Sequence, residues 1–418
     1  MICLVKGGEI MLTKTLKIQL YPDKKQQQSL YKTQLLFTKG CNHVSDYIFN
    51  HDFDLNQRHL HDCLYYQLRK DFQLQSQMAQ SVIRTVISRY KTINTTLKQK
   101  PYKFKDINTN QYHYVKRNVK WLKKPVQFNS NIAVFVRNRN YSLLKNGQYS
   151  ISTVDGRLKI DCDSNQLSYI SQFNDWKHGE AELLQRRGQW FLYISVSKDI
   201  DSVEKQSVQH VVGIDRGLRQ LMTTYNEKDQ THFFNGQNVL KQRRHFIKLR
   251  QQLQSKNTKS SQRRLRQIEQ RENRWMSDVN HQLSKTLLDQ FGKHTLFVLE
   301  DLTNVTFDTV NQRHKSHRYE HVSWSFFDLE QKLIYKALES KCMVVKVDAH
   351  YTSQRCPKCG CIDRANRDKS QHLFECIQCH YRSNDDRVAA MNIQELGKQY
   401  ISGIEKPHFE KLEPKLEY

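Results

Sequence analysis

Two pairs of closely spaced cysteines place the strongest constraint on how this chain can fold. Cys356 and Cys359 form the first pair, and Cys376 and Cys379 form the second after sixteen intervening residues. Each pair can present two thiolates from one tight turn, and two such turns that face each other complete a tetrahedral zinc site. Four thiolates leave no open coordination position, so the spacing predicts a structural zinc ribbon rather than a catalytic zinc.

The other cysteines lack this spacing. Cys361 lies within the cluster as a spare thiol, and His372 and His380 are weaker substitutes for a zinc ligand. The remaining cysteines stand alone along the chain: Cys3, Cys41, Cys63, Cys162 and Cys342. Single cysteines beside one cluster of pairs indicate a reducing compartment, so we expect a cytoplasmic protein with a metal site rather than disulfides.

The charge balance predicts a polyanionic partner. The chain has 418 residues, with 67 Lys and Arg against 42 Asp and Glu, which gives a formal net charge of +25. Because each neutralised phosphate releases condensed counterions, an excess of this size favours nucleic acid and a nucleoid-associated location. A membrane surface is the other polyanion, but no stretch has the roughly 18 apolar residues that cross a bilayer, and no secretory signal is recognised.

Basic and aromatic residues support the same prediction. Residues 241–274 contain twelve Lys or Arg and only two acids, which predicts a basic helical hairpin that contacts phosphates. The chain also has 19 Phe, 20 Tyr and 5 Trp. Such rings can stack on unpaired bases, although we expect most of them in the core.

Hydrophobic periodicity organises the first half of the chain. Residues 14–20 alternate as a strand that Pro22 ends, whereas the apolar period over residues 24–98 is helical. Alternation returns over residues 126–198. Two hairpin turns interrupt it, at Asn146-Gly147 and Asp155-Gly156. A strand, a helical insertion and further strands predict a small β-barrel interrupted by helices.

Two hydrophobic runs in the second half, 211–215 and 295–300, each read as a buried strand that ends in an acid, Asp215 or Glu300. A third acid, Asp386, follows the second cysteine pair at the start of a predicted helix. An acid in that position can also serve only to cap the helix.

Hydrolysis of a phosphodiester by two divalent ions needs several carboxylates that converge on one point. One ion activates the attacking water and the other stabilises the leaving oxygen. If the two acid-terminated strands are neighbours, Asp215, Glu300 and Asp386 are candidate catalytic residues and magnesium ligands.

At this point the motifs resemble those of TnpB, the OrfB-type proteins of bacterial insertion sequences, which are relatives of the compact type V CRISPR nucleases. The similar stretches are Gly213-Ile214-Asp215-x-Gly217, Leu299-Glu300-Asp301-Leu302, Asp386-x-x-Ala389-Ala390-x-Asn392-Ile393, Thr352-Ser353-Gln354-x-Cys356-x-x-Cys359-Gly360 and Leu16-Lys17-Ile18-Gln19-Leu20-Tyr21-Pro22. The first three correspond to the RuvC motifs of that family, and together the motifs extend from Met11 to about Ile393.

The resemblance implies an α/β fold: an RNase H-like RuvC nuclease domain with an inserted zinc ribbon, preceded by a small wedge β-barrel that a helical recognition lobe interrupts. The implied domains are the wedge barrel over 11–23 and 122–204, the recognition lobe over 24–121, the RuvC nuclease over 205–351 and 385–396, the zinc ribbon over 352–384, and a flexible tail over 397–418. Residues 1–10 are expected to precede the native start at Met11, because Lys6-Gly7-Gly8-Glu9 resembles a translated ribosome-binding site.

The resemblance also implies a function, that of an RNA-guided DNA endonuclease. In this family the protein holds a guide RNA, reads a short target-adjacent DNA motif and leaves the rest of the target to base pairing. The implied partners are a guide RNA and double-stranded DNA, bound by a monomer. The implied cofactors are one structural zinc and catalytic Mg²⁺, with Asp215, Glu300 and Asp386 as the RuvC triad.

Two departures from the family pattern affect the third motif. Val388 stands where the family usually has Asn, and Asp385 lies directly beside Asp386. Counting back from Ala389-Ala390 favours Asp386 as the catalytic acid, because adjacent helical residues point about 100° apart and cannot share one role. Asp301 is expected on the opposite face of its strand from Glu300.

Three alternatives remain. His59-Leu60-His61 imitates the metal pair of tyrosine transposases, but that stretch is predicted to be helical rather than a strand. A cut-and-paste transposase of the RNase H fold usually has its acids in the order Asp, Asp, Glu, whereas this chain has Asp, Glu, Asp. A guide-dependent DNA-binding regulator without cleavage would be expected to have lost acids that this chain retains.

Overall fold

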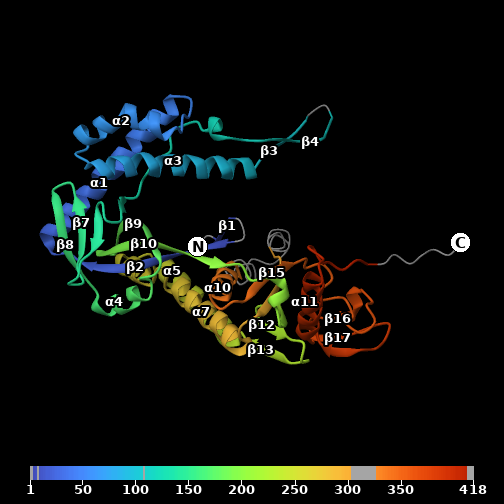
Figure 1. Ribbon diagram of the computed structural model, residues 1–418. Helices are drawn as coiled ribbons and strands as arrows, with labels where there is room; N and C mark the ends of the chain where they lie inside the picture. Colours follow the sequence, from blue (N-terminus) through green and yellow to red (C-terminus); the bar gives the residue numbers. More distant parts are fainter. Residues whose placement is uncertain (1–2, 7–8, 107–108, 303–325, 412–418) are drawn as a thin grey trace. The chain divides into compact units, whose positions relative to one another are not determined.

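The computed structural model describes residues 3–6, 9–106, 109–302 and 326–411, and it is a mixed α/β structure (Figure 1). The chain divides into two compact units, Met1–Asp199 and Ile200–Tyr418. Each unit has hydrophobic clusters of its own.

The first unit is built on one large sheet, in the order β5-β9-β10-β2-β8-β7-β6, with β1 paired to β2. Its strands are β1 (Cys3–Lys6), β2 (Glu9–Tyr21), β5 (Ala133–Val136), β6 (Tyr141–Leu143), β7 (Tyr149–Thr153), β8 (Gly156–Cys162), β9 (Lys177–Arg186) and β10 (Gln189–Asp201). An isolated bridge between Arg137 and Tyr141 connects the outer strands β5 and β6, so the sheet is nearly closed. Strand β2 lies between β10 and β8, which confirms that strands from both sides of the helical insertion form one sheet.

Three helices occupy the insertion: α1 (Lys24–Asn50), α2 (Gln57–Asp71) and α3 (Ser76–Gln99). A capping box formed by Asp23 and Gln26 starts α1. The predicted apolar stripe of α3 is buried, and the stretch with His59 and His61 is helical, as expected. The prediction that the lobe over 24–121 is entirely helical was wrong. After α3, β3 (Tyr102–Lys105) and β4 (Tyr112–Val115) form a hairpin. A short helix, α4 (Ser164–Ser171), is a further element that the sequence did not predict.

The second unit is organised by a five-stranded sheet in the order β13-β12-β11-β14-β15. Its strands are β11 (His210–Asp215), β12 (Gln220–Tyr225), β13 (Thr231–Asn235), β14 (Thr295–Glu300) and β15 (Met343–Val347). The three strands β11, β14 and β15 run parallel, while β12 and β13 pair antiparallel at one edge. The two strands predicted to end in acids, β11 and β14, are therefore direct neighbours.

Helices cover both faces of this sheet. On one face, α7 (Arg271–Phe291) and α10 (Phe326–Glu339) pack on Val212 and Ile214 of β11. On the other face, α11 (Asp385–Ile401) lies directly on the strands. A Cβ atom on Gly213 would lie 2.1 Å from the carbonyl oxygen of Ala390, so only glycine allows this close approach.

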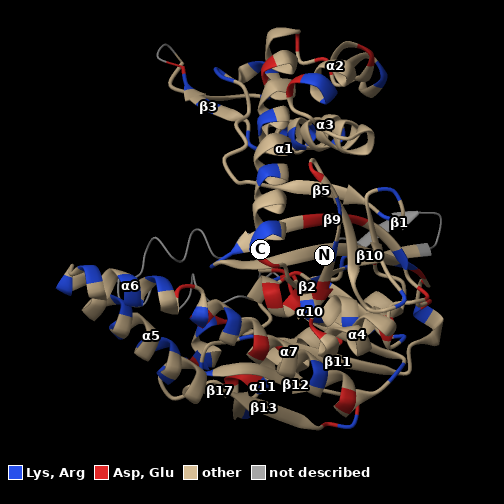
Figure 2. Ribbon diagram, turned by 90° about the vertical axis from the view of Figure 1, so that its left-hand side faces the viewer, with Lys and Arg blue, Asp and Glu red and all other residues tan. Residues whose placement is uncertain are grey.

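The basic segment 241–274 is helical, as predicted, but it contains parts of three helices. It spans α5 (Gln237–Lys256), the short α6 (Lys259–Ile268) and the first turn of α7. The helices are interrupted at Asn257 and Gln270. Both residues adopt left-handed backbone conformations, with φ of 44° and 58°. Lys and Arg are spread along α5 and α6 (Figure 2).

The C-terminal part of the chain corrects the predicted flexible tail over residues 397–411, whereas residues 412–418 of that predicted tail lie outside the described residues. Helix α11 continues to Ile401, and Phe409 is buried among Leu296, Val298 and Leu396. Before α11, β16 (Arg367–Asp368), β17 (Leu373–Glu375) and β18 (Arg382–Asn384) form a small antiparallel sheet beside the cysteine cluster. Among the described residues no helix is long and apolar enough to cross a membrane.

Candidate active site and metal centre

The parallel pairing of β11 and β14 brings two of the predicted acids together. Ile214 lies opposite Leu299, so Asp215 and Glu300 end neighbouring strands at the same edge. Side chains alternate along a strand, and Asp215 shares its face of β11 with Gly213, which contacts α11. Glu300 shares its face of β14 with Val298, which also packs on α11. Both acids therefore lie on the face that α11 covers.

The third acid comes from α11 itself. Asn384 caps this helix and accepts the backbone N–H of Arg387, which leaves both acids of the first turn free for other contacts. Asp386 is partly buried and close enough to Asp215 for its charge to raise the pKa of Asp215. The structure thus brings together Asp215, Glu300 and Asp386 from positions spread over 172 residues.

The electrostatics of this group favour a bound cation. Burial raises the pKa of Asp215 well above its ordinary value, and the charges of Glu300 and Asp386 raise it further. Burial also raises the pKa of Glu300 and of Asp386, in the latter case with a contribution from Asp385. Three carboxylates that repel one another in a partly dry site can all be ionised if divalent ions neutralise them. Oxygen ligands of this kind suit Mg²⁺.

Two side chains hold Glu300 in place. The hydroxyl of Thr352 donates a hydrogen bond of 2.5 Å to Oε1 of Glu300. The guanidinium of Arg216, the residue after Asp215, donates to the backbone carbonyl of Glu300 at 2.5 Å and pairs with Glu330 of α10 at 3.4 Å. Glu300 itself is only 9% exposed, so these contacts fix its position in the site.

Asn392 of α11 fixes Thr352 in turn. Its amide nitrogen donates to the carbonyl oxygens of Thr352 and Arg355, each at 2.7 Å. Its amide oxygen accepts a hydrogen bond of 3.2 Å from the guanidinium of Arg355. Both Thr352 and Asn392 are 1% exposed. A buried polar bridge therefore connects Glu300, the segment that leads into the first cysteine pair, and α11.

Asp385 and Asp386 occupy different environments. Asp385 is completely buried, where it accepts a hydrogen bond of 2.8 Å from Nε of Arg367 and lies 3.5 Å from Nδ1 of His372. It also accepts the backbone N–H of Asp386 at 3.0 Å. By contrast, the nearest cationic nitrogen to Asp386 in the described ion pairs is Nη2 of Arg367, at 3.8 Å. Asp385 is thus held by a structural network, whereas Asp386 remains available to the carboxylate group.

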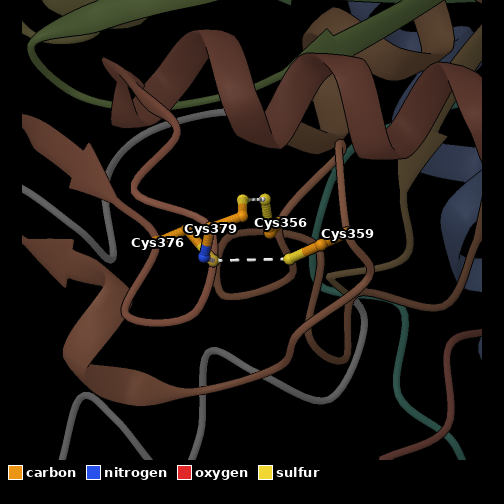
Figure 3. A group of neighbouring side chains, drawn as sticks. All are labelled: Cys356, Cys359, Cys376 and Cys379. Carbon is orange, nitrogen blue, oxygen red and sulfur yellow. Dashed lines mark hydrogen bonds between the residues drawn. The ribbon is translucent and has the colours of Figure 1, made fainter.

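The four predicted zinc ligands also lie together. Their sulfur atoms are all within 4.8 Å of one another, and the Sγ atoms of Cys356 and Cys379 and of Cys359 and Cys376 are 3.5 Å apart (Figure 3). Cys356 and Cys376 are buried, while Cys359 and Cys379 are exposed. This arrangement could hold one zinc ion with four thiolates.

The two cysteine turns have matching backbone hydrogen bonds. Cys356 N–H donates to the Cys361 carbonyl and Cys376 N–H donates to the Tyr381 carbonyl, at 2.8 and 2.9 Å. Gly360 has φ of 79° in the first turn, and His380 takes the equivalent left-handed conformation in the second, with φ of 56°. His380 therefore shapes its turn, and neither Cys361 nor His380 belongs to the group of four sulfur atoms.

Several residues of the site were not identified from sequence. Thr352, Asn392 and Arg216 stood within the similar motifs but had no assigned role, and Arg367 stood outside those motifs. The partners of these side chains lie between 18 and 114 residues away, so local patterns do not reveal them. Only a search for a cation near the adjacent acids Asp385 and Asp386 could have pointed to Arg367.

Comparison with known proteins connects both parts of the second unit to described families. Residues 193–304 match the OrfB_IS605 family, described as a probable transposase. Residues 326–393 match the TNB domain of Cas12f1-like proteins. The two matches include Asp215, Glu300, Asp386 and the four cysteines.

Curated relatives cover part of the chain. A CRISPR-associated endodeoxyribonuclease Cas12f1 of Sulfoacidibacillus thermotolerans is 38% identical over 136 residues, which are 31% of this chain and 30% of that protein. The putative RNA-guided DNA endonuclease InsQ of Escherichia coli is 27% identical over 232 residues, 52% of this chain and 56% of that protein. The chain thus matches less than two thirds of the length of either relative.

Solved structures show the same fold over nearly the whole chain. The Cas12f1 protein in a complex with single-guide RNA and target DNA covers 92% of this chain and 99% of its own, with a TM-score of 0.59 and 12% identity. The mini-RNA-guided endonuclease CRISPR-Cas_phi3 covers 96% and 94%, with a TM-score of 0.55 and 10% identity. The fold is that of the compact Cas12 effectors, and the chain carries the OrfB-type transposase domain and the Cas12f1-like TNB domain that its resemblance to TnpB predicted.

Proposed function

We propose that this protein is an RNA-guided DNA endonuclease of a transposable element, which hydrolyses phosphodiester bonds at Asp215, Glu300 and Asp386. The observation that carries the proposal is the convergence of these three acids from β11, β14 and α11 on one face of the sheet. We assign 205–351 and 385–396 to an RNase H-like RuvC nuclease domain, and 352–384 to a zinc ribbon inserted within it.

The three acids act together in the proposed chemistry. Asp215, Glu300 and Asp386 would hold Mg²⁺, which when bound activates a water molecule and stabilises the leaving oxygen. Thr352 orients the carboxylate of Glu300, and Arg216 fixes its backbone, so the ligand geometry is set before DNA arrives. Burial and the charge of Asp385 raise the pKa of Asp386, and the positive charge of Arg367, whose Nη2 lies 3.8 Å away, opposes this rise.

The cysteine cluster would hold structural zinc. Four thiolates from two turns satisfy tetrahedral coordination, and the bound ion would stabilise the segment between β15 and α11. Because Thr352 and Arg367 belong to this segment, zinc binding also supports the position of the carboxylates.

The proposed partners are a guide RNA and double-stranded DNA next to a short target-adjacent motif, bound by a monomer. The net charge of +25 supports polyanion binding, and the relatives named above are called RNA-guided or CRISPR-associated nucleases. We assign the wedge barrel to 11–23 and 122–204 and the recognition lobe to 24–121.

The deciding experiment measures cleavage of a plasmid by the protein purified with RNA from its own flanking DNA. Asp215→Ala, Glu300→Ala and Asp386→Ala should each abolish cleavage in Mg²⁺ while they leave RNA and target binding intact. Asp301→Asn is the matched control, because Asp301 pairs with Lys346 on the other face of the strand. Normal cutting by all three variants would exclude these three acids as the catalytic site. Guide-dependent binding without cutting by the wild-type protein would instead favour a regulator, and cutting without RNA would favour a transposase.

A further inference from the structure

The hairpin of β3 and β4 exposes an unusual number of rings. All eight residues of its two strands are exposed, and four of them are aromatic: Tyr102, Phe104, Tyr112 and Tyr114, which are 40% to 62% exposed. A two-stranded hairpin has little stability of its own in water, and exposed apolar patches usually mark interaction sites. The hairpin thus has the character of a binding element rather than of a core element.

One face of the hairpin is a row of rings. Phe104 lies opposite His113 in the strand register, so these side chains share a face with Tyr102. The ring centroids of Tyr102 and Phe104 are 6.2 Å apart at an interplanar angle of 23°, and those of Phe104 and His113 are 5.5 Å apart at 27°. Trp121 extends the row, 5.9 Å from Tyr102. We call Tyr102, Phe104, His113 and Trp121 the ring face.

The opposite face combines lysines with tyrosines. Lys103 lies opposite Tyr114, and Lys105 lies opposite Tyr112. The ammonium of Lys103 is 3.9 Å from the ring centroid of Tyr112 and 5.7 Å from that of Tyr114. These cation–π contacts hold the Lys103 charge on the hairpin while its exposed side leaves it open to an anion.

The root of the hairpin is fixed to α3. Nε of Arg117 donates to the carbonyl of Lys100 at 2.8 Å, and the N–H of Val119 donates to Oδ1 of Asn94 at 3.2 Å. The side chain of Val119 is buried in the core of the unit. Substitutions on the ring face should therefore leave the root and the core unchanged.

The charge around the hairpin selects the class of partner. Residues 98–124 contain nine Lys or Arg and one acid, Asp106, whose carboxylate lies 3.7 Å from His113. Exposed aromatic rings can stack on the free faces of unpaired bases. The flanking Lys and Arg side chains can bind the phosphates that connect those bases. A protein partner with this surface would need a strongly acidic patch of its own.

We propose that the hairpin of β3 and β4 is a docking surface for unpaired nucleotides of single-stranded RNA, whose bases stack on the ring face. The choice of RNA rests on the proposed function, in which DNA arrives as a duplex with its bases already stacked on one another. Sequence-specific and loop-specific binding of RNA uses splayed bases that stack on aromatic side chains. Lys103 and Lys105 would then contact the backbone of the same strand.

The test measures binding of a short, 5′-labelled oligouridine to the full chain by fluorescence anisotropy, with EDTA present and no guide RNA. Tyr102→Ala combined with Phe104→Ala should weaken binding about tenfold or more, because stacking is worth about 1–3 kcal/mol per base. Tyr66→Ala is the matched control, since Tyr66 is an aromatic residue of the same unit that is 79% exposed. Tyr102→Phe should retain binding, because it keeps the ring. Photo-crosslinked 4-thiouridine should map to residues 102–105 or 112–115.

One further probe and one comparison decide what the surface recognises. If oligothymidine binds as tightly as oligouridine and the double variant weakens both equally, the choice of RNA is overturned. The ligand would then be a single strand of DNA. Equal binding of every probe by wild type and double variant would overturn the docking surface itself. Neither result depends on cleavage, so a nuclease that cuts DNA normally can still fail this test, and a chain that does not cut can still pass it.

Discussion

Two adjacent acids, Asp385 and Asp386, show how one position along a helix separates a structural carboxylate from one that we propose is catalytic. Asp385 is completely buried and paired with Arg367, whereas the side chain of Asp386 is 16% exposed and interacts with Asp215. A buried charge that loses its partner leaves the other charge uncompensated. The same substitution should therefore have different consequences at the two positions.

We expect Asp386→Asn to abolish DNA cleavage with little change in thermal stability. Asp385→Asn should lower the free energy of unfolding by about 2–3 kcal/mol, less than for a fully buried pair because Arg367 is partly exposed. Plasmid cleavage and denaturant melts on both variants would check this. A stable but inactive Asp385→Asn together with an active Asp386→Asn would show that the catalytic acid is Asp385.

Thr352 gives a second prediction at the scale of a single residue. Thr352→Val removes the donor to Glu300 but keeps the shape of the side chain. We expect a higher Mg²⁺ concentration at half-maximal cleavage and roughly tenfold slower cutting, since an unmade buried hydrogen bond costs about 1–3 kcal/mol. Thr352→Ser keeps the hydroxyl and should restore Mg²⁺ affinity. A Mg²⁺ titration that is identical in all three proteins would argue against a positioning role for Thr352.

At the scale of elements, the contact between β11 and α11 decides whether the third acid reaches the site. A Cβ atom at position 213 would lie 2.1 Å from a backbone carbonyl of α11, which cannot yield as a flexible side chain could. Any larger residue there must displace the helix that carries Asp386.

We therefore expect Gly213→Ala to lower stability by about 1–3 kcal/mol through overpacking and to reduce cleavage strongly. Gly179→Ala is the matched control, because its Cβ would meet its nearest neighbour at an ordinary 3.5 Å. Melting temperatures and cleavage rates of the two variants give the comparison. Cleavage by Gly213→Ala at the wild-type rate would mean that α11 does not need to lie so close to β11.

The cysteine turns lead to a prediction about metal removal. Purified protein should contain one zinc per chain, and Cys376→Ser should lose it and destabilise the segment around β16–β18. Cleavage should also fall, because Thr352 and Arg367 reach the carboxylates from this segment. Cys342→Ser is a suitable control, since Cys342 is buried in a different hydrophobic cluster from Cys356 and Cys376. Elemental analysis that finds no zinc in active protein would contradict the assignment.

The elements differ in how well the sequence predicted them, for physical reasons. Strands β11 and β14 were predictable because both are buried hydrophobic runs, and their acids converge because parallel neighbours end at the same edge. The hairpin of β3 and β4 was not predicted, because its exposed faces carry no alternation between core and solvent. The breaks at Asn257 and Gln270 lack the Gly or Pro that usually marks a helix end. The hydrogen-bond partners of Arg367 and Thr352 are distant in sequence and meet these side chains only in the folded structure, so no local sequence pattern reveals them.

At the scale of the whole molecule, the excess of 25 positive charges predicts a strong dependence of RNA affinity on salt. With roughly 6–10 phosphate contacts, affinity should fall about 10³- to 10⁵-fold between 50 and 200 mM salt. Replacement of Arg263, Arg264 and Arg266 in α6 by Gln should make this dependence less steep. Filter binding at increasing KCl measures both slopes, and an affinity that does not change with salt would contradict a phosphate-dominated interface.

The order of the elements along the chain has a consequence for the newly made protein. The sheet of the first unit is complete once β10 has been synthesised, whereas the carboxylate group requires α11, almost two hundred residues later. Domains generally fold in the order in which they leave the ribosome. The nascent chain can therefore fold its first unit, with the hairpin that we propose binds RNA, while it still has no means of cutting DNA. Under the proposed function, cleavage competence is therefore added last, and translation that stops early yields a chain that lacks the carboxylates of α11.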